Sequence, residues 1–182
     1  QSVTILKSPD RYMLSGGGFY CEGTPGTRLS LDTSNSGITY KLFVGKTTPL
    51  DTVIPASDGQ FYFDGYYKEG EYSVYAIAPN GCADSMQNTQ TIIRKDLPAD
   101  AHDITGDDTV SLGGTGSFSV PPLANTHTYK WKLPNGASIA SGSGSRSIDV
   151  SFSTATAVGY DSVAVYGDNS CGDGGTAYFK IY

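Results

Sequence analysis

Apolar and polar residues alternate along most of the chain, and helical spacing is almost absent. Residues 28–31 read Arg-Leu-Ser-Leu, and residues 147–152 read Ser-Ile-Asp-Val-Ser-Phe. A period of two is typical of β-strands that bury one face. Turn pairs such as Asp58-Gly59 and Asn135-Gly136 separate these runs at the short intervals of a β-sandwich. The pattern predicts an all-β protein.

The chain also resembles itself at a nearly constant offset. Residues 39–42 (Thr-Tyr-Lys-Leu) return as 128–131 (Thr-Tyr-Lys-Trp), and 80–82 (Asn-Gly-Cys) return as 169–171 (Asn-Ser-Cys). Both pairs lie 89 positions apart, and the first block of the repeat lies 90 apart. Two tandem modules of about 90 residues with related folds explain this register.

The repeat register sets the domain boundaries. We assign residues 1–8 to the end of a preceding repeat or a linker, 9–97 to the first module and 98–182 to the second. Seven short strands in about 90 residues fit an immunoglobulin-like sandwich. We expect Trp131 in the core of the second module, where Leu42 is its counterpart in the first. The expected strands are 12–16, 27–33, 38–45, 50–55, 60–66, 71–79 and 87–95, then 102–106, 115–121, 127–133, 137–141, 146–153, 160–168 and 175–182.

Charge narrows the range of partners. The chain has 12 Lys+Arg against 18 Asp+Glu, a formal net charge of −6. Nucleic acids and anionic membranes attract clustered Lys and Arg, so neither is expected as a partner. No apolar run approaches the ~20 residues that span a bilayer, so we expect no membrane insertion.

Three cysteines follow the repeat register. Cys21 opens the first module and Cys82 follows its sixth strand, so we expect a disulfide between them, worth about 4 kcal/mol by loop closure. The second module keeps Cys171 but has Ser111 where the partner should lie, so Cys171 is expected to be a free thiol. The alternative is that all three are buried free thiols in a cytosolic protein.

Several motifs resemble repeats of very large secreted surface proteins of Bacteroidota. In the first module these are residues 16–23 (Gly-Gly-Gly-Phe-Tyr-Cys-Glu-Gly) and 70–74 (Gly-Glu-Tyr-Ser-Val), which resemble their Ig-like repeats. The second module resembles the accompanying PKD-like repeats at 129–137, 141–150 and 169–172. The resemblance covers nearly the whole chain.

The resemblance implies a non-catalytic stalk or display repeat of a giant adhesin, exported by the type IX secretion system to the outer cell surface, as in gliding motility. Neighbouring repeats of the same polypeptide, surface glycans or other surface proteins would be the partners. It also implies O-glycosylation at Asp-Ser/Thr motifs followed by an aliphatic residue. These sites are Thr52, Ser85, Thr109 and Ser162.

Catalytic chemistry has little support in the residues. The two imidazoles, His102 and His127, lie at the module junction and at a strand entry, and neither is beside a nucleophile motif. The cysteine spacing does not match a zinc site, and no glycine-rich phosphate loop precedes a helix. We expect no enzyme activity, no catalytic residues and no cofactor.

Two groups of residues are candidates for binding. Five carboxylates near the junction are hard oxygen ligands that Ca²⁺ prefers, although a solvated linker explains them as well. An aromatic group around one strand and its turn offers stacking faces for sugars, although core packing is the simpler interpretation. The first group is Asp96, Asp100, Asp103, Asp107 and Asp108, and the second is Tyr62, Tyr66 and Tyr67.

A second function class competes with the adhesin repeat. The chain would then be a carbohydrate-binding accessory module of a secreted polysaccharide-degrading enzyme. Binding to glycans separates the two, because a pure stalk repeat has no ligand of its own.

Overall fold

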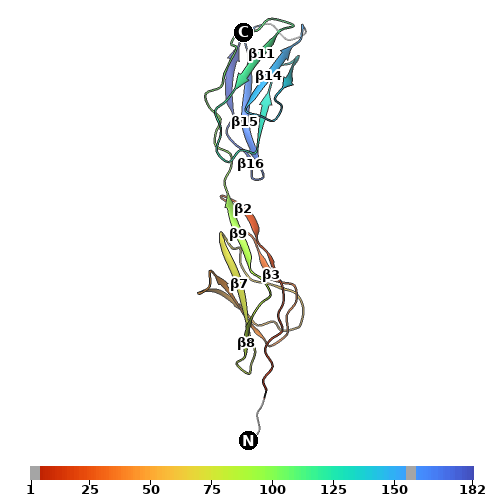
Figure 1. Ribbon diagram of the computed structural model, residues 1–182, viewed down its shortest axis with the longest axis vertical. Coiled ribbons are helices and arrows are strands. Elements are labelled where there is room, and N and C mark those ends of the chain that lie inside the picture. The colour runs from red at the N-terminus through yellow and green to blue at the C-terminus, as the bar shows by residue number, and fades with distance from the viewer. Residues whose placement is uncertain (1–4, 155–158) are drawn as a thin grey trace. The chain divides into compact units, whose positions relative to one another are not determined.

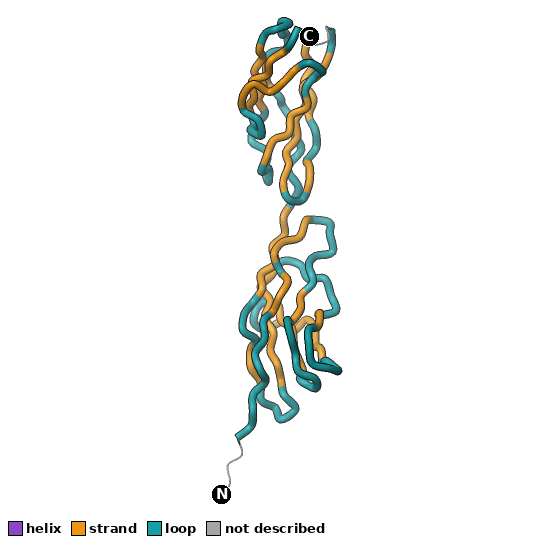
Figure 2. The backbone as a smooth tube through the Cα atoms, turned by 90° about the vertical axis from the view of Figure 1, so that its right-hand side faces the viewer, coloured by secondary structure: helices purple, strands orange, loops and turns teal. Residues whose placement is uncertain are grey.

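The computed structural model describes residues 5–154 and 159–182 and divides the chain into two units. The first unit spans residues 1–95 and the second spans 96–182, close to the boundary that the repeat register predicts. Every regular element in the described residues is a strand, which confirms the all-β prediction (Figure 2). The described residues contain no helix with the length and apolarity to cross a bilayer.

The first unit is built from two sheets. The smaller sheet has the order β1-β3-β6, and the larger has the order β2-β9-β7-β4-β5 with β8 paired to β7 (Figure 1). The strands are β1 (Leu14–Gly16), β2 (Gly18–Cys21), β3 (Leu29–Leu31), β4 (Thr39–Val44), β5 (Thr48–Val53), β6 (Phe61–Tyr62), β7 (Gly70–Ile77), β8 (Ala83–Ser85) and β9 (Gln90–Lys95). Each of the seven expected strands has a counterpart, and β2 and β8 are additional.

Glycines move the chain from one sheet to the other between β1 and β2. Gly16, Gly17 and Gly18 all have positive φ angles, of 99°, 81° and 88°. A Cβ on Gly16 would lie 2.2 Å from the carbonyl oxygen of Arg28, so a larger residue cannot fit there. After this turn β2 pairs in parallel with β9 on the larger sheet.

The core of the first unit lies between its two sheets. Its largest fully buried side chains include Tyr40, Phe63 and Leu42. Phe61 packs against this core and its ring centroid lies 5.4 Å from that of Tyr40. Phe61 and Phe63 therefore both point toward this core.

The second unit is also a two-sheet structure. One sheet has the order β10-β11-β14-β13, and the other has the order β12-β15-β16 with β17 paired to β15. The strands are β10 (Thr105–Gly106), β11 (Thr115–Ser119), β12 (Thr128–Lys132), β13 (Ala137–Ser141), β14 (Ser147–Phe152), β15 (Asp161–Asn169), β16 (Gly172–Asp173) and β17 (Ala177–Ile181). The seven expected strands are present, and β16 is additional.

Trp131 packs against the core of the second unit, as predicted. It is partly buried and contacts both buried clusters of that unit, which include Val163 and Val165. Its indole Nε1 donates a hydrogen bond to the carbonyl oxygen of Ser145 at 2.9 Å. The polar end of the ring therefore has a partner while its apolar body covers the core.

The two units repeat one another in detail. The backbone N–H of Cys82 donates to Asn80 Oδ1 at 2.9 Å, and that of Cys171 donates to Asn169 Oδ1 at 2.7 Å. The same side-chain-to-backbone turn thus follows the long strand β7 in one unit and β15 in the other.

Strands β5 and β13 hold equivalent positions in the repeat but belong to different sheets of their units. In the first unit β5 pairs with β4, whereas its counterpart β13 pairs with β14 in the second unit. The available partners differ in length, since β14 has six residues and the equivalent β6 has two. A six-residue strand offers a full ladder of backbone hydrogen bonds, and a two-residue strand does not.

Candidate functional site

The three candidate tyrosines have different environments. Tyr62 and Tyr66 are exposed, at 52% and 62% of their surface, and Arg28 lies over the Tyr62 ring with its Cζ 4.8 Å from the centroid. Tyr67 packs against the core, and its hydroxyl donates to Asp51 Oδ2 at 3.1 Å. Burial, followed by the Asp51 carboxylate, raises the pKa of Tyr67 well above its ordinary value. Only Tyr62 and Tyr66 therefore present rings to solvent.

The cysteine assignments from the repeat register are wrong. The free cysteine is Cys82, which is half-buried, and the disulfide-bonded cysteines are Cys21 and Cys171. The expected Cys21–Cys82 bond and the expected free thiol at Cys171 are both corrected.

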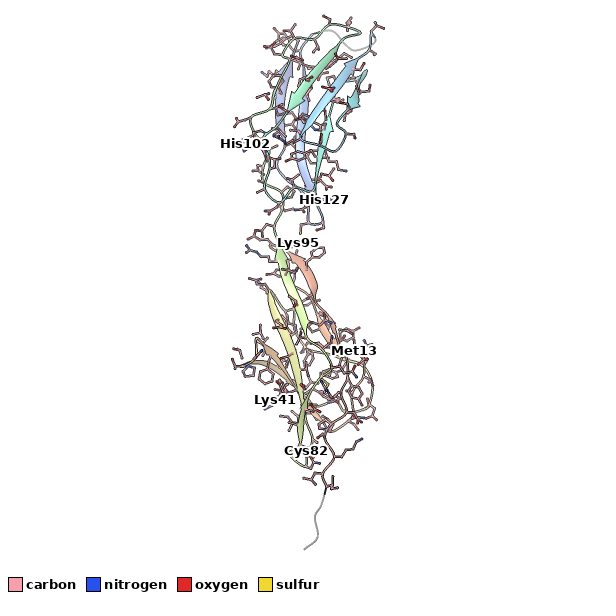
Figure 3. The ribbon with its side chains drawn as sticks, viewed as in Figure 1. Met13, Lys41, Cys82, Lys95, His102 and His127 are labelled. Atoms are coloured by element: carbon pink, nitrogen blue, oxygen red, sulfur yellow. The ribbon has the colours of Figure 1, made fainter. Side chains whose placement is uncertain are left out.

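Strand register explains why Cys21 and Cys82 do not pair. Cys21 is level with Lys95, at the end of the larger sheet where β7 begins, whereas Cys82 follows the opposite end of β7. The eight residues of β7 span roughly 25 Å, and a disulfide needs Cα atoms within about 7 Å. Figure 3 shows Lys95 and Cys82 at opposite ends of the first unit.

Strand register also shows that Ser111 and Cys171, which were expected to be neighbours, lie far apart. Val110, beside Ser111, donates its N–H to the carbonyl oxygen of Tyr182 near one end of β15. Cys171 lies in the turn at the other end of this nine-residue strand. Ser111→Cys therefore cannot restore a bond to Cys171 without large backbone movement.

The five junction carboxylates are not gathered into a metal site. Among the described residues, no group of three or more His, Cys, Asp or Glu side chains could hold a metal ion. Asp100 accepts the N–H of Gly175, and Asp107 accepts the N–H of Ser117. Asp108 accepts the hydroxyl of Thr109. Asp100 and Asp107 therefore each hold a backbone N–H of the second unit, and the five Ca²⁺ candidates are not brought together into one site.

Neither histidine is placed for catalysis. His102 Nδ1 lies 2.9 Å from Asp103 Oδ2, and both side chains are exposed. His127 is exposed and uses its backbone N–H to bond the carbonyl oxygen of Asp168. In the described part of the chain, no Ser, Thr or Cys forms a hydrogen bond with either imidazole. Figure 3 labels both residues.

The four predicted glycosylation motifs share a local geometry. In each motif the aspartate Oδ1 accepts a hydrogen bond from the residue that follows. That donor is the backbone N–H at Thr52, Ser85 and Ser162, and the hydroxyl at Thr109. Thr52 and Thr109 are exposed, whereas Ser85 and Ser162 are half-buried. Thr52 and Thr109 are therefore the accessible acceptors.

A shallow polar cavity of about 460 Å³ lies on the β10-β11-β14-β13 sheet. At its edge Asp149 accepts hydrogen bonds from Ser141 Oγ at 2.7 Å and from Ser117 Oγ at 2.8 Å. The bond from Ser141, followed by that from Ser117, lowers the pKa of Asp149 below 3.8. No sequence motif marks this site, because its members come from three strands.

We expect Ser141→Ala to raise the pKa of Asp149 toward its ordinary value. Because the folded-state pKa is lowered, the two bonds favour the folded state above about pH 4, and this contribution disappears as pH falls through the folded pKa. A carboxyl NMR titration measures the shift. Ser138→Ala, on the same sheet but without a bond to Asp149, is the control and should leave the titration unchanged.

All lysines of the second unit lie on one face of the sheet formed by β12, β15, β16 and β17. Lys130, Lys132 and Lys180 are the only lysines between residues 96 and 182, and all three are exposed. They alternate with Tyr129 and Trp131, which pack inward on β12. Since successive strand residues point to opposite faces, the lysines lie on the outer face of this sheet.

Strand register places two tyrosines among these lysines. On β15, Ala164 pairs with Lys132 of β12 on one side and with Tyr178 of β17 on the other. Tyr166 of β15 pairs with Lys130 of β12. Tyr178 is 71% exposed, and Ala164 is buried beneath its longer neighbours. We call Lys130, Lys132, Tyr166, Tyr178 and Lys180 the lysine–tyrosine face. No sequence motif marks this face, because its members lie on three separate strands.

The second unit matches a known family. Residues 97–181 fit the model of the PKD-like domain. The match agrees with the two-sheet structure of that unit described above. No curated protein matches the sequence significantly.

Solved structures share the fold at low sequence identity. A chain from the crystal structure of mouse coronavirus receptor-binding domain complexed with its murine receptor is 9% identical, with a TM-score of 0.51, covering 93% of this chain and 100% of that chain. The chicken CNTN1 FN1–FN3 domains are 16% identical, with a TM-score of 0.48, covering 95% of this chain and 64% of that chain. At 9% identity, the first similarity shows the fold alone.

Proposed function

We propose that the chain is a non-catalytic structural repeat pair of a large extracellular adhesin, exported by type IX secretion and used in surface attachment or gliding. The observation that supports this most is the repetition of a two-sheet unit, which includes the equivalent Asn80 and Asn169 turns. Repeats of this kind act as spacers, since each carries its own core.

Two further observations support the location and the absence of chemistry. Disulfide-bonded Cys21 and Cys171 agree with an oxidising compartment outside the cell. His102 contacts Asp103, and Asp100 and Asp107 accept backbone N–H groups, so these residues are bonded within the second unit. The role proposed is to project a distal binding region, with neighbouring repeats as the direct partners.

Immunolabelling tests this location and role. Antibodies against this chain should label intact producing cells, and an in-frame deletion of both units from the full-length protein should weaken attachment while the shortened protein still reaches the surface. Labelling that appears only after the cells are permeabilised would contradict the proposal.

The second candidate is a carbohydrate-binding accessory module of a secreted polysaccharide-degrading enzyme. The lysine–tyrosine face favours it, because the exposed Tyr178 ring offers an apolar surface for a sugar ring and the exposed lysines offer charges to acidic groups. The full-length reading frame separates the two candidates, since one requires many repeats and the other requires a catalytic domain.

A further inference from the structure

We propose that the lysine–tyrosine face binds an anionic polysaccharide, a glycan chain that carries carboxylate or sulfate groups. This inference deepens the carbohydrate-binding candidate by naming its ligand class. It does not rest on the stalk role.

The cations of this face are available to a ligand. Lys130, Lys132 and Lys180 form no ion pair within the described parts of the chain. Lys132 makes a cation–π contact, with its Nζ 5.3 Å from the centroid of the Tyr166 ring. An unpaired ammonium group at the surface is a compact charge that can meet a carboxylate or a sulfate.

Two acidic residues border the face at the end beyond Lys130. Asp168 lies on the same side of β15 as Tyr166, two residues further along, and pairs with Asp173 of β16. Both therefore lie beyond Lys130, at the end of the sheet furthest from Lys180. The face is positive from Lys130 to Lys180, and its acidic border favours a ligand that runs toward β17.

The dimensions of the face fit a chain rather than a single sugar. Lys130 is opposite Tyr166, Lys132 is opposite Ala164, and Lys180 is opposite Ser162, so the lysines form a diagonal row across three strands. At ~3.3 Å per residue and ~4.8 Å between strands, the Cα atoms of Lys130 and Lys180 are roughly 16 Å apart. A single monosaccharide cannot meet all three charges.

The tyrosines distinguish a glycan from other anions. Tyr178 is exposed and lies beside Lys132 across the buried Ala164, so a sugar ring can pack on its face while the adjacent lysine meets an acidic group. Nucleic acid fits less well, since its affinity depends on many phosphate contacts and the face offers three lysines. An acidic peptide would use the charges but not the ring.

Affinity electrophoresis of the full chain in low-salt native gels tests the inference. The probes are alginate and polygalacturonate for carboxylates, chondroitin sulfate for sulfates, and dextran as the neutral polymer. We expect a carboxylated or a sulfated polymer to retard the protein, with dextran having no effect. The triple variant K130Q/K132Q/K180Q should bind about tenfold more weakly, the sum expected of three exposed charge contacts. Y178A should weaken binding without changing its salt dependence.

A matched variant controls for net charge. K7Q/K46Q/K68Q removes three exposed lysines from the first unit, so it changes the charge equally and should leave binding intact. Equal binding of the two triple variants, or equal retardation by polyglutamate or a DNA duplex, would overturn the inference. If only dextran retards the protein, the inference of an anionic ligand is wrong and the carbohydrate-binding candidate still stands. No retardation by any glycan would overturn both and leave the stalk proposal standing.

Discussion

Treatment of the native, unreduced protein with iodoacetamide should alkylate Cys82 and leave Cys21 and Cys171 unmodified. Cys82 is a half-buried free cysteine in the turn between β7 and β8, whereas the other two are disulfide-bonded and cannot react as thiols. Peptide mapping by mass spectrometry measures the result. After reduction under denaturing conditions all three should be alkylated.

Cys82→Ser is the control for this experiment, because it should abolish labelling of the unreduced protein and leave Cys21 and Cys171 unreactive. Labelling of Cys171 in the absence of reductant would contradict the structure. It would instead support the pairing of Cys21 with Cys82 that the repeat register predicts.

Replacing Trp131 by alanine should lower the free energy of unfolding of the second unit by about 3 kcal/mol. The indole packs on both buried clusters of that unit and its Nε1 bonds the carbonyl oxygen of Ser145, so truncation leaves a cavity and an unpaired acceptor. Urea denaturation followed by circular dichroism measures the loss.

Lys132→Ala provides the matched control for Trp131→Ala, since Lys132 is the next residue on β12 and is exposed. Its effect should stay within about 0.5 kcal/mol. A loss below about 1 kcal/mol for Trp131→Ala would show that the indole is not a core residue.

The alternating pattern is enough to predict the main strands, because burial of one face leaves a period of two in the sequence. It cannot predict β2, since the positive φ angles of Gly16 to Gly18 rather than an apolar pattern carry that strand to the other sheet. The alternating pattern also cannot predict that β5 and β13 join different sheets, because this depends on the length of the partner strands.

The cysteine error has a physical origin. Matching positions in a repeat shows which residues are equivalent, but it does not show at which end of a sheet each one lies. Cys21 and Cys82 belong to one unit yet are separated by the length of β7. Only strand register supplies that separation.

The lysine–tyrosine face illustrates the same limit for sites. Lys130 and Lys132 are close in sequence, but Tyr178 and Lys180 join them only through pairing with β15. Tyr67, by contrast, belongs to a sequence cluster and turns out to pack on the core. Clustering along the chain is a weak guide to binding residues on a sheet surface.

Single-molecule stretching of the reduced protein tests most directly whether the chain is a pair of separately folded repeats. Each unit has its own core, so we expect two separate unfolding events. Each event should release up to ~300 Å of chain, at about 3.3–3.6 Å per residue for some 90 residues. One event of twice that length, or extension without resistance, would contradict the account.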